Sequence, residues 1–181
     1  MTKKTAILLY PDFSEYELTT ALSILMQGRK PVSFIGLTKE PIRGESGLTC
    51  LPDLTIDEVD FEQYDSLLLS GCMYIDKIID ISEYTSFIEN ISAQRDFIIA
   101  AISSSPYLLA KAGVLKGKKY TVGLAEKLRK ESPYFEEENY VSELVVTDGN
   151  LITAWGSAFI TFGAQFGKAL KLDFEKSWYR G

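Results

Sequence analysis

The sequence predicts a single α/β domain in which helices sandwich a mostly parallel sheet. Short apolar runs of strand length alternate along the chain with helical patterns, which is typical of parallel strands joined by crossover helices. The chain has 181 residues, of which 46% are hydrophobic, enough to bury one sizeable core. No internal repeat or linker interrupts the pattern. We therefore expect residues 1–181 to form one domain.

In the first half of the chain, apolar runs predict strands, and a cap signal predicts a helix. Ser14 and Glu17 have the spacing of a capping box, in which each side chain satisfies a free backbone N–H at the helix start. This helix is expected to end at Gly28. Residues 52–63 are mostly polar and predict a connection with one helical turn. The expected strands are residues 5–10, 31–37 and 66–69, with an edge hairpin at 41–50.

The second half of the chain contains a hairpin signal and further helices. Asp148-Gly149-Asn150 lies between strands expected at 143–147 and 151–154, and such turn residues favour a hairpin. Ser157 is expected to cap the final helix. The other expected elements are helices at 82–94, 125–130 and 158–172, a short strand at 116–122 and a charged loop at 131–139.

The stretch around Ser103 is the most informative part of the sequence. Residues 96–102 contain a continuous apolar run typical of a central strand buried on both faces, and a helix begins near Pro106 after only three serines. So sharp a turn lifts one side chain, best assigned to Ser103, above the sheet, and the following N–H groups point at whatever binds there. That is the geometry of a nucleophile elbow. The alternative is a serine-rich helix N-cap without chemistry.

Composition argues against several classes of function. The net charge of −6 without a basic cluster argues against nucleic-acid binding. No apolar run reaches the roughly 18 residues of a membrane span, and the apolar segment before Pro11 is too short for a signal peptide. Cys50 and Cys72 form no metal motif, so a cytoplasmic protein with reduced thiols is expected.

The sequence contains no histidine. This absence removes serine–histidine triads, cysteine–histidine dyads and most catalytic zinc arrangements. Any chemistry must use carboxylates, hydroxyls, thiols, lysines or the backbone. We expect neither a metal nor a cofactor.

Several residues that directly follow expected strands are small, polar or aromatic. Ligands of open α/β sheets bind beyond the carboxyl ends of the strands. We therefore expect these residues to share one rim. They are Glu17, Gly71, Cys72, Ser103, Ser104, Trp155 and Gly156.

Five segments together resemble one known family. Residues 100–103, Ala-Ala-Ile-Ser, resemble its Ala-Ala-Ile-Cys elbow, and residues 108–118 match the sequel to that elbow closely. On these motifs the sequence is identified as a member of the ThiJ/PfpI superfamily, relatives of the class I glutamine amidotransferases that include the parkinsonism-associated deglycase and the PfpI intracellular protease. The resemblance implies a flavodoxin-like three-layer sandwich and a homodimer. The other matching segments are residues 8–17, 64–71 and 147–156.

The resemblance also implies that several site residues have changed. The elbow cysteine of the family is Ser103 here, the glycine two residues later is Ser105, and the second glycine of a Gly-Gly turn is Cys72. A helix N-terminus can ionise a thiol but not a serine hydroxyl, which needs an adjacent base. Glu17 is the one family-matched candidate, and in the family this position is a carboxylic acid that hydrogen-bonds the cysteine.

The sequence leaves three functions open. The first is a catalytically reduced family member that binds a small molecule at the old site. The second is a hydrolase or lyase of the family type that uses Ser103 and Glu17 on a small carbonyl or amide compound, with the Ser104 N–H and the backbone near Cys72 as oxyanion donors. The third is a dimeric interaction protein without a functional pocket. Trp155 is either a wall of the site or an ordinary half-buried aromatic residue.

Overall fold

The protein, described by a computed structural model over residues 2–179, is built on a seven-stranded sheet. All neighbouring strands are parallel except the pair at one edge. The five inner strands follow the 2-1-3-4-5 order of flavodoxin-like folds, so the predicted fold class is confirmed. From one edge to the other the strands are β5 (Leu54–Thr55), β2 (Val32–Gly36), β1 (Lys4–Leu8), β6 (Tyr64–Leu69), β7 (Ile98–Ile102), β9 (Leu151–Ala154) and β8 (Val145–Asp148).

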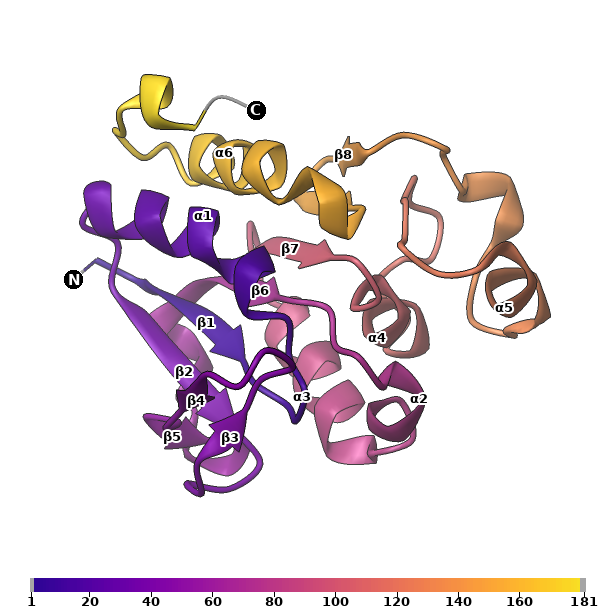
Figure 1. The fold of residues 1–181 in the computed structure, drawn as a ribbon, viewed down its shortest axis with the longest axis horizontal. Coiled ribbons are helices and arrows are strands. Elements are labelled where there is room, and N and C mark those ends of the chain that lie inside the picture. Colours follow the sequence, from indigo (N-terminus) through magenta and orange to yellow (C-terminus); the bar gives the residue numbers. More distant parts are fainter. Residues whose placement is uncertain (1, 180–181) are drawn as a thin grey trace.

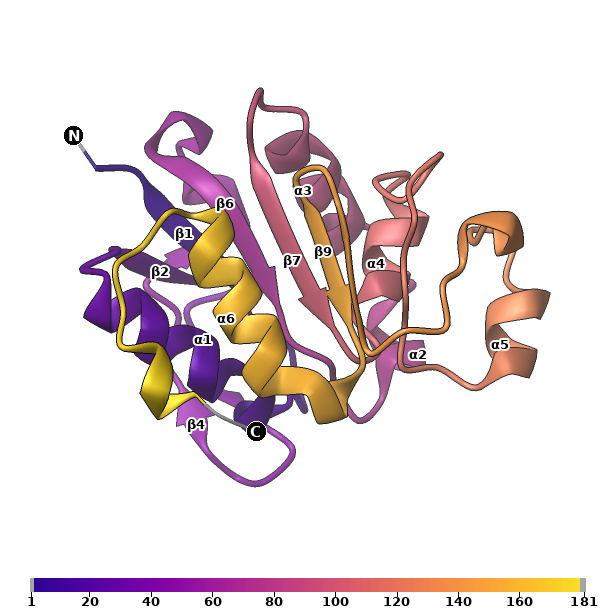
Figure 2. The ribbon, with the colours of Figure 1, turned by 90° about the horizontal axis from the view of Figure 1, so that it is seen from above.

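Helices cover both faces of the sheet as two outer layers (Figure 1, Figure 2). Within residues 2–179 no helix combines the length and the apolar character that crossing a membrane requires. The layers are α1 (Glu15–Gln27) and α6 (Phe159–Ala169) on one face and α3 (Ser82–Ser92) and α4 (Pro106–Lys111) on the other, with the shorter α2 (Ile75–Ile78) and α5 (Glu126–Glu131) in connecting segments.

The core fills the space between these layers. The central strands are apolar on both faces because helices cover both sides of the sheet. Leu68 in β6 and Ala100 in β7 are fully buried, for example. The helix predicted near residues 82–94 is present as α3, and it turns one apolar stripe, which is fully covered, towards the sheet. The members of this stripe are Tyr84, Phe87, Ile88 and Ile91.

The hairpin expected after the second strand is present, but it stands apart from the main sheet. It consists of β3 (Ile42–Arg43) and β4 (Thr49–Cys50), which pair antiparallel. The carboxylate of Glu15, at the start of α1, accepts hydrogen bonds from the backbone N–H groups of Ser46 and Leu48 at 2.9 to 3.0 Å. This contact ties the hairpin tip to the helix.

Both predicted cap interactions are wrong, although both helices begin close to the expected places. Ser14 is the N-cap residue of α1, but its hydroxyl donates to the Glu45 carboxylate. The Glu17 carboxylate accepts from the Gly71 N–H instead of the helix start. Ser157 lies in a 3-10 turn before α6 and makes no cap. In α1, partners from distant loops have replaced the local ones.

Three further local predictions need correction. No strand forms at residues 116–122. Tyr120 makes an isolated bridge to Tyr140, and the Thr121 N–H donates to the side-chain hydroxyl of Thr153 in β9 rather than to a backbone carbonyl of that strand. The connection at 52–63 contains β5 and two 3-10 turns, and the prediction omitted the four-residue α2. Elements this short carry too few residues for a periodic pattern.

Two glycines allow α6 to approach α1 closely. A Cβ on Gly163 would lie 2.9 Å from the backbone nitrogen of Ala21, closer than real contacts allow. A Cβ on Gly167 would collide with Ile24. Because α1 also carries Glu17, this close packing fixes the position of that carboxyl above the sheet.

We expect Gly163→Ala to lower the free energy of unfolding. Overpacking costs about 1–3 kcal/mol, which exceeds the roughly 1 kcal/mol that alanine gains over glycine in a helix. Urea denaturation measures the change. Thr161→Ala, at an exposed position of the same helix, is the matched control and should leave stability unchanged or slightly raised. Stabilisation by Gly163→Ala would show that the two helices have room to separate.

Candidate functional site

The turn that follows β7 holds Ser103 in a left-handed backbone conformation, with a φ of 64°. The Ser103 N–H donates to the carbonyl of Ala154 (2.8 Å), and the Ser103 carbonyl accepts from the Gly123 N–H (2.7 Å). Such a conformation costs a non-glycine residue on the order of 1–3 kcal/mol, so the surroundings must impose it. The serine side chains do not cap α4, because its N-cap residue Ser105 makes no side-chain cap bond.

Glu17 reaches the same region from the first turn of α1. Its side chain is buried, with 1% of the residue exposed. One carboxyl oxygen accepts from the Gly71 N–H at 2.6 Å, and the other from the Tyr16 hydroxyl at 3.1 Å. Burial raises the pKa of Glu17 above its ordinary value, although hydrogen bonds from Gly71, the Ser103 hydroxyl and Tyr16 oppose that shift. The protonated carboxyl is therefore favoured more than on an exposed glutamate.

Two glycines form the walls between which Ser103 and Glu17 meet. A Cβ on Gly71 would lie 2.8 Å from both Ser103 Oγ and Glu17 Oε2. A Cβ on Gly156 would lie 3.2 Å from Ser103 Oγ and would collide with Glu17 Oε1. Any larger residue at either position would displace the hydroxyl or the carboxyl.

The hydroxyl of Ser104 occupies the backbone N–H of Cys72, which was expected to be a free oxyanion donor. Ser104 Oγ accepts from the Cys72 N–H at 3.0 Å and lies 3.3 Å from the Cys72 carbonyl. Only the N–H of Ser104 was expected to take part in the site, so this contact of its hydroxyl was not predicted from the sequence. Burial raises the pKa of the Cys72 thiol to about 12, so the thiol stays protonated at neutral pH, which favours a small buried residue over a displaced reactive thiol.

The hydroxyl of Ser105 is held by the backbone and is not available to a ligand. Its side chain is fully buried, and its Oγ lies 2.8 Å from the carbonyl of Ile102 and 3.1 Å from that of Leu69. These contacts join the start of α4 to the ends of β6 and β7. The three consecutive serines thus have three different sets of partners.

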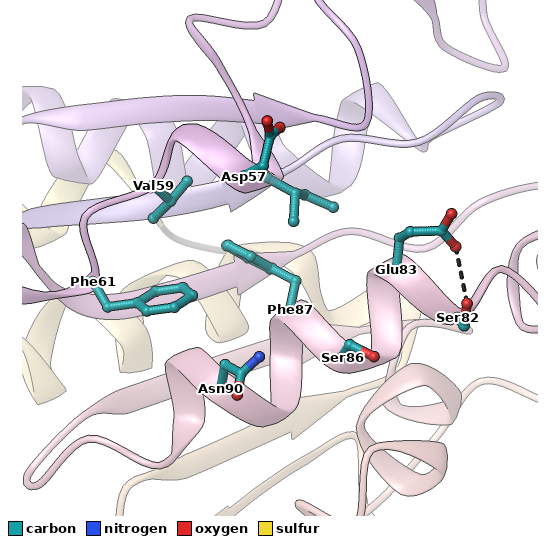
Figure 3. Close-up of a pocket in the computed structure, with 9 residues that line it drawn as sticks. Asp57, Val59, Phe61, Ser82, Glu83, Ser86, Phe87 and Asn90 are labelled. Carbon is teal, nitrogen blue, oxygen red and sulfur yellow. Dashed lines mark hydrogen bonds between the residues drawn. The ribbon is translucent and has the colours of Figure 1, made fainter.

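Trp155 lies at the end of β9, half-exposed, and its indole Nε1 donates to Thr121 Oγ1 at 2.9 Å. It lines a cavity of about 380 Å³ that none of the other predicted site residues lines. A second cavity, of about 390 Å³, lies between residues 56–61 and α3 (Figure 3). Its walls include Phe61 and Phe87, and no predicted site residue lines it.

Two contacts of the site were not predicted, because no pattern in the sequence indicates them. Tyr16 bonds the Glu17 carboxyl from the adjacent position in the chain. Gly123 approaches so closely that a Cβ on it would lie 3.2 Å from the Ser103 Cα. Across residues 2–179 there is no cluster of three or more acidic or thiol side chains that could hold a metal ion.

Comparison with known proteins gives consistent matches over most of the chain. The DJ-1/PfpI family profile matches residues 3–169. Protein DJ-1alpha of Drosophila melanogaster is 30% identical over 94% of this chain and 76% of its own length. Protein/nucleic acid deglycase 2 of Escherichia coli is 29% identical over 85% of this chain and 89% of its own. The crystal structure of a thiJ/pfpI family protein from Bacillus anthracis superposes with a TM-score of 0.84 at 28% identity, covering 99% of this chain and 89% of that one.

The environment of Glu17 predicts a pH dependence of stability. Its pKa is higher in the folded state than in the unfolded state, so its contribution to stability is present below the unfolded value of about 4.3 and is lost as the pH rises through the folded value. We expect Glu17→Gln to gain stability relative to the parent protein as the pH rises from about 4 towards 7. Chemical denaturation at a series of pH values measures the difference.

Glu15 supplies a control of opposite sign. Burial acts to raise its pKa, but hydrogen bonds from its own backbone and from the N–H groups of Ser46 and Leu48 outweigh burial and lower the pKa. Glu15→Gln should therefore lose stability relative to the parent at neutral pH, and the loss should shrink as the pH falls below about 4.3. The same sign for both variants would contradict the assigned environments.

Proposed function

Because the chain belongs to the DJ-1/PfpI family, we propose that it is a catalytically reduced member that binds a small molecule at the rim around Ser103. In this proposal Ser103 stands where the family has its elbow cysteine, and Glu17 stands at the matching acid. Ser103 is a partly exposed residue, and its hydroxyl and the Ser104 N–H are the polar groups offered to a ligand. We also place the protein in the cytoplasm, since Cys50 and Cys72 are free thiols.

The contact between Ser104 and Cys72 carries this proposal. Acyl transfer at Ser103 would place a developing negative charge near the N–H groups of Cys72 and Ser104. Such donors act only when they are free and aimed at that charge. The Cys72 N–H already donates to Ser104 Oγ. The loss of one oxyanion donor lowers turnover by roughly 10²–10³-fold.

The available base is also poorly matched to a serine. Without histidine, the proton of Ser103 would have to pass to Glu17, and a carboxylate is a far weaker base than a serine alkoxide. Burial of Glu17 favours its protonated form, which can donate a hydrogen bond but cannot accept a proton. Both features support ligand binding over turnover.

A second candidate is a hydrolase or lyase that uses Ser103 and Glu17. It is favoured by the left-handed backbone of Ser103, by the proximity of the hydroxyl to the carboxyl, and by the name of the Escherichia coli relative, a deglycase. Its signature would be turnover of a small carbonyl or amide compound by the pure protein. That turnover would be lost in Ser103→Ala.

We also propose a homodimer. Leu48 and Leu51, beside the β3–β4 hairpin, are more than half exposed, as is Met26 on α1. Apolar side chains at a short strand pair benefit from cover by a second chain. A dimeric interaction protein without a functional pocket is the remaining alternative, and it predicts that no small molecule binds at the rim.

The reduced-site proposal predicts that two substitutions together restore reactivity. Ser103→Cys places a thiol at the elbow, and Ser104→Ala frees the Cys72 N–H. In a Cys50→Ser background, we expect acylation by p-nitrophenyl acetate to be at least about tenfold faster in Ser103→Cys/Ser104→Ala than in Ser103→Cys. Burst kinetics measure acylation. The control is Ser103→Cys/Ser105→Ala, which removes a buried hydroxyl that does not contact Cys72 and should match Ser103→Cys.

Two results would reject the proposal. Equal rates in the Ser104→Ala and Ser105→Ala double variants would mean that the Cys72 N–H has no oxyanion role. Ester turnover by the unmodified protein that disappears in Ser103→Ala would establish the second candidate instead.

The dimer proposal predicts a species of twice the chain mass. Sedimentation equilibrium at micromolar concentration should show it, and Leu48→Glu/Leu51→Glu should shift the protein towards monomer by placing charge on the apolar surface. Lys168→Glu, at an exposed site on α6, is the control. A monomer across the whole concentration range would refute the dimer.

A further inference from the structure

A cavity of about 380 Å³ lies beside the rim, and the proposed function assigns no role to most of the side chains that line it. Charged and aromatic side chains from α5, the segment after it and the end of β9 line it. The lining residues are Leu124, Glu126, Arg129, Tyr140, Ser142 and Trp155.

This cavity adjoins the elbow through the backbone on two sides. Leu124 directly follows Gly123, whose N–H donates to the Ser103 carbonyl. Trp155 directly follows Ala154, whose carbonyl accepts from the Ser103 N–H. A ligand at the elbow therefore has this cavity as a neighbouring space.

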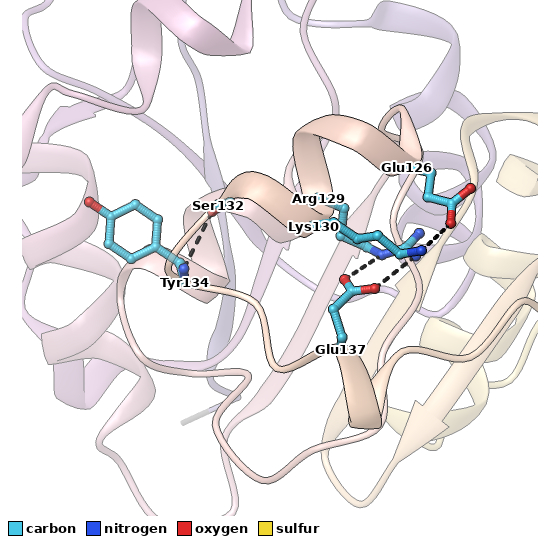
Figure 4. Close-up of polar contacts among 6 residues, drawn as sticks. All are labelled: Glu126, Arg129, Lys130, Ser132, Tyr134 and Glu137. Carbon is cyan, nitrogen blue, oxygen red and sulfur yellow. Dashed lines mark hydrogen bonds and ion pairs between the residues drawn. The ribbon is translucent and has the colours of Figure 1, made fainter.

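Arg129 is the most unusual residue in the lining. Only 6% of it is exposed. Its Nε and Nη2 donate to the Glu137 carboxylate at 2.8 and 3.1 Å (Figure 4), and its Cζ lies 3.4 Å from the centre of the Tyr140 ring. A guanidinium has five N–H donors, and the other three of Arg129 have no acceptor within residues 2–179. A buried, immobilised arginine thus presents unused donors at a cavity.

The aromatic part of the lining is also fixed in place. The bond from Trp155 Nε1 to Thr121 sets the orientation of the indole, and 36% of the residue remains exposed. Arg129 stacks on the Tyr140 ring, so the indole is the aromatic surface left for a ligand. Glu126 lines the cavity too, but its carboxylate pairs with Lys130 (Figure 4).

We propose that this cavity is the part of the rim site that holds a small planar carboxylic acid. The carboxylate accepts from the unused N–H groups of Arg129, and the planar body lies against the indole of Trp155. Guanidinium and carboxylate match in geometry, and flat π-systems stack on tryptophan. This inference rests on the proposed function, because it names the ligand class of the same site.

Trp155 itself provides the measurement. The chain has two tryptophans, so Trp178→Phe leaves Trp155 as the sole indole. We expect benzoate to quench its fluorescence in a saturable manner, and benzyl alcohol, which lacks the charge, to bind roughly tenfold more weakly. Equal responses to the two compounds, or no response to benzoate, would overturn the inference.

Ser142 is an exposed residue of the lining, so substitutions there test whether benzoate binds in this cavity without disturbing the core. Ser142→Phe fills the space and should abolish the benzoate response, whereas Ser142→Ala should keep it. Glu137→Gln removes the charge that neutralises Arg129 and should tighten benzoate binding but not benzyl alcohol binding. A benzoate response that survives in Ser142→Phe would place the acid elsewhere and reject the assignment.

A second probe separates this inference from the proposed function. In a Ser103→Cys, Cys50→Ser, Trp178→Phe protein, iodoacetamide alkylation of the introduced thiol reports on the elbow. Quenching of Trp155 with slower alkylation supports the shared site. Quenching without slower alkylation rejects the shared site and counts against ligand binding at the elbow. Slower alkylation without quenching overturns the cavity assignment alone and leaves the proposed function standing.

Discussion

The site depends on one backbone constraint, the left-handed conformation of Ser103. Two hydrogen bonds clamp this residue, one to the carbonyl of Ala154 at the end of β9 and one from the N–H of Gly123. Both partners come from segments well after Ser103 in the chain, so the conformation exists only once the sheet is assembled. The same clamp directs the side chain between Gly71 and Gly156, where it meets the Glu17 carboxyl. Strain at the elbow and the geometry of the site therefore have a single cause.

The first turn of α1 carries two glutamates whose pKa values shift in opposite directions, because they face different surroundings. Glu15 faces the hairpin tip, where backbone N–H groups bind its carboxylate and lower its pKa. Glu17, two residues later, faces the sheet, where burial raises its pKa. The helix is held rigidly enough for this distinction because Gly163 lets α6 pack directly on its backbone. One helix thus supplies a structural anion and a buried acid from positions two residues apart.

The sequence predicted the parts of the molecule that depend on local pattern. Apolar runs of strand length predicted the main strands. The abrupt change from such a run to Pro106 predicted the sharp turn at Ser103. The capping box failed because Ser14 and Glu17 found partners in distant loops, and β5 and α2 are too short to leave a pattern. The bond between Ser104 and Cys72 joins residues 32 positions apart. Local spacing carries no information about such a pair.

The contacts of the three serines at the elbow explain why the proposed site draws its specificity from the neighbouring cavity. The Ser104 hydroxyl is held at the Cys72 backbone, and the Ser105 hydroxyl at the carbonyls of β6 and β7. Only the Ser103 hydroxyl remains as a side-chain contact at the elbow, and a single hydroxyl distinguishes few small molecules. In the proposed site, the fixed donors on Arg129 and the fixed indole of Trp155 would discriminate between ligands by charge and by shape. The proposal therefore assigns ligand selection to these two residues.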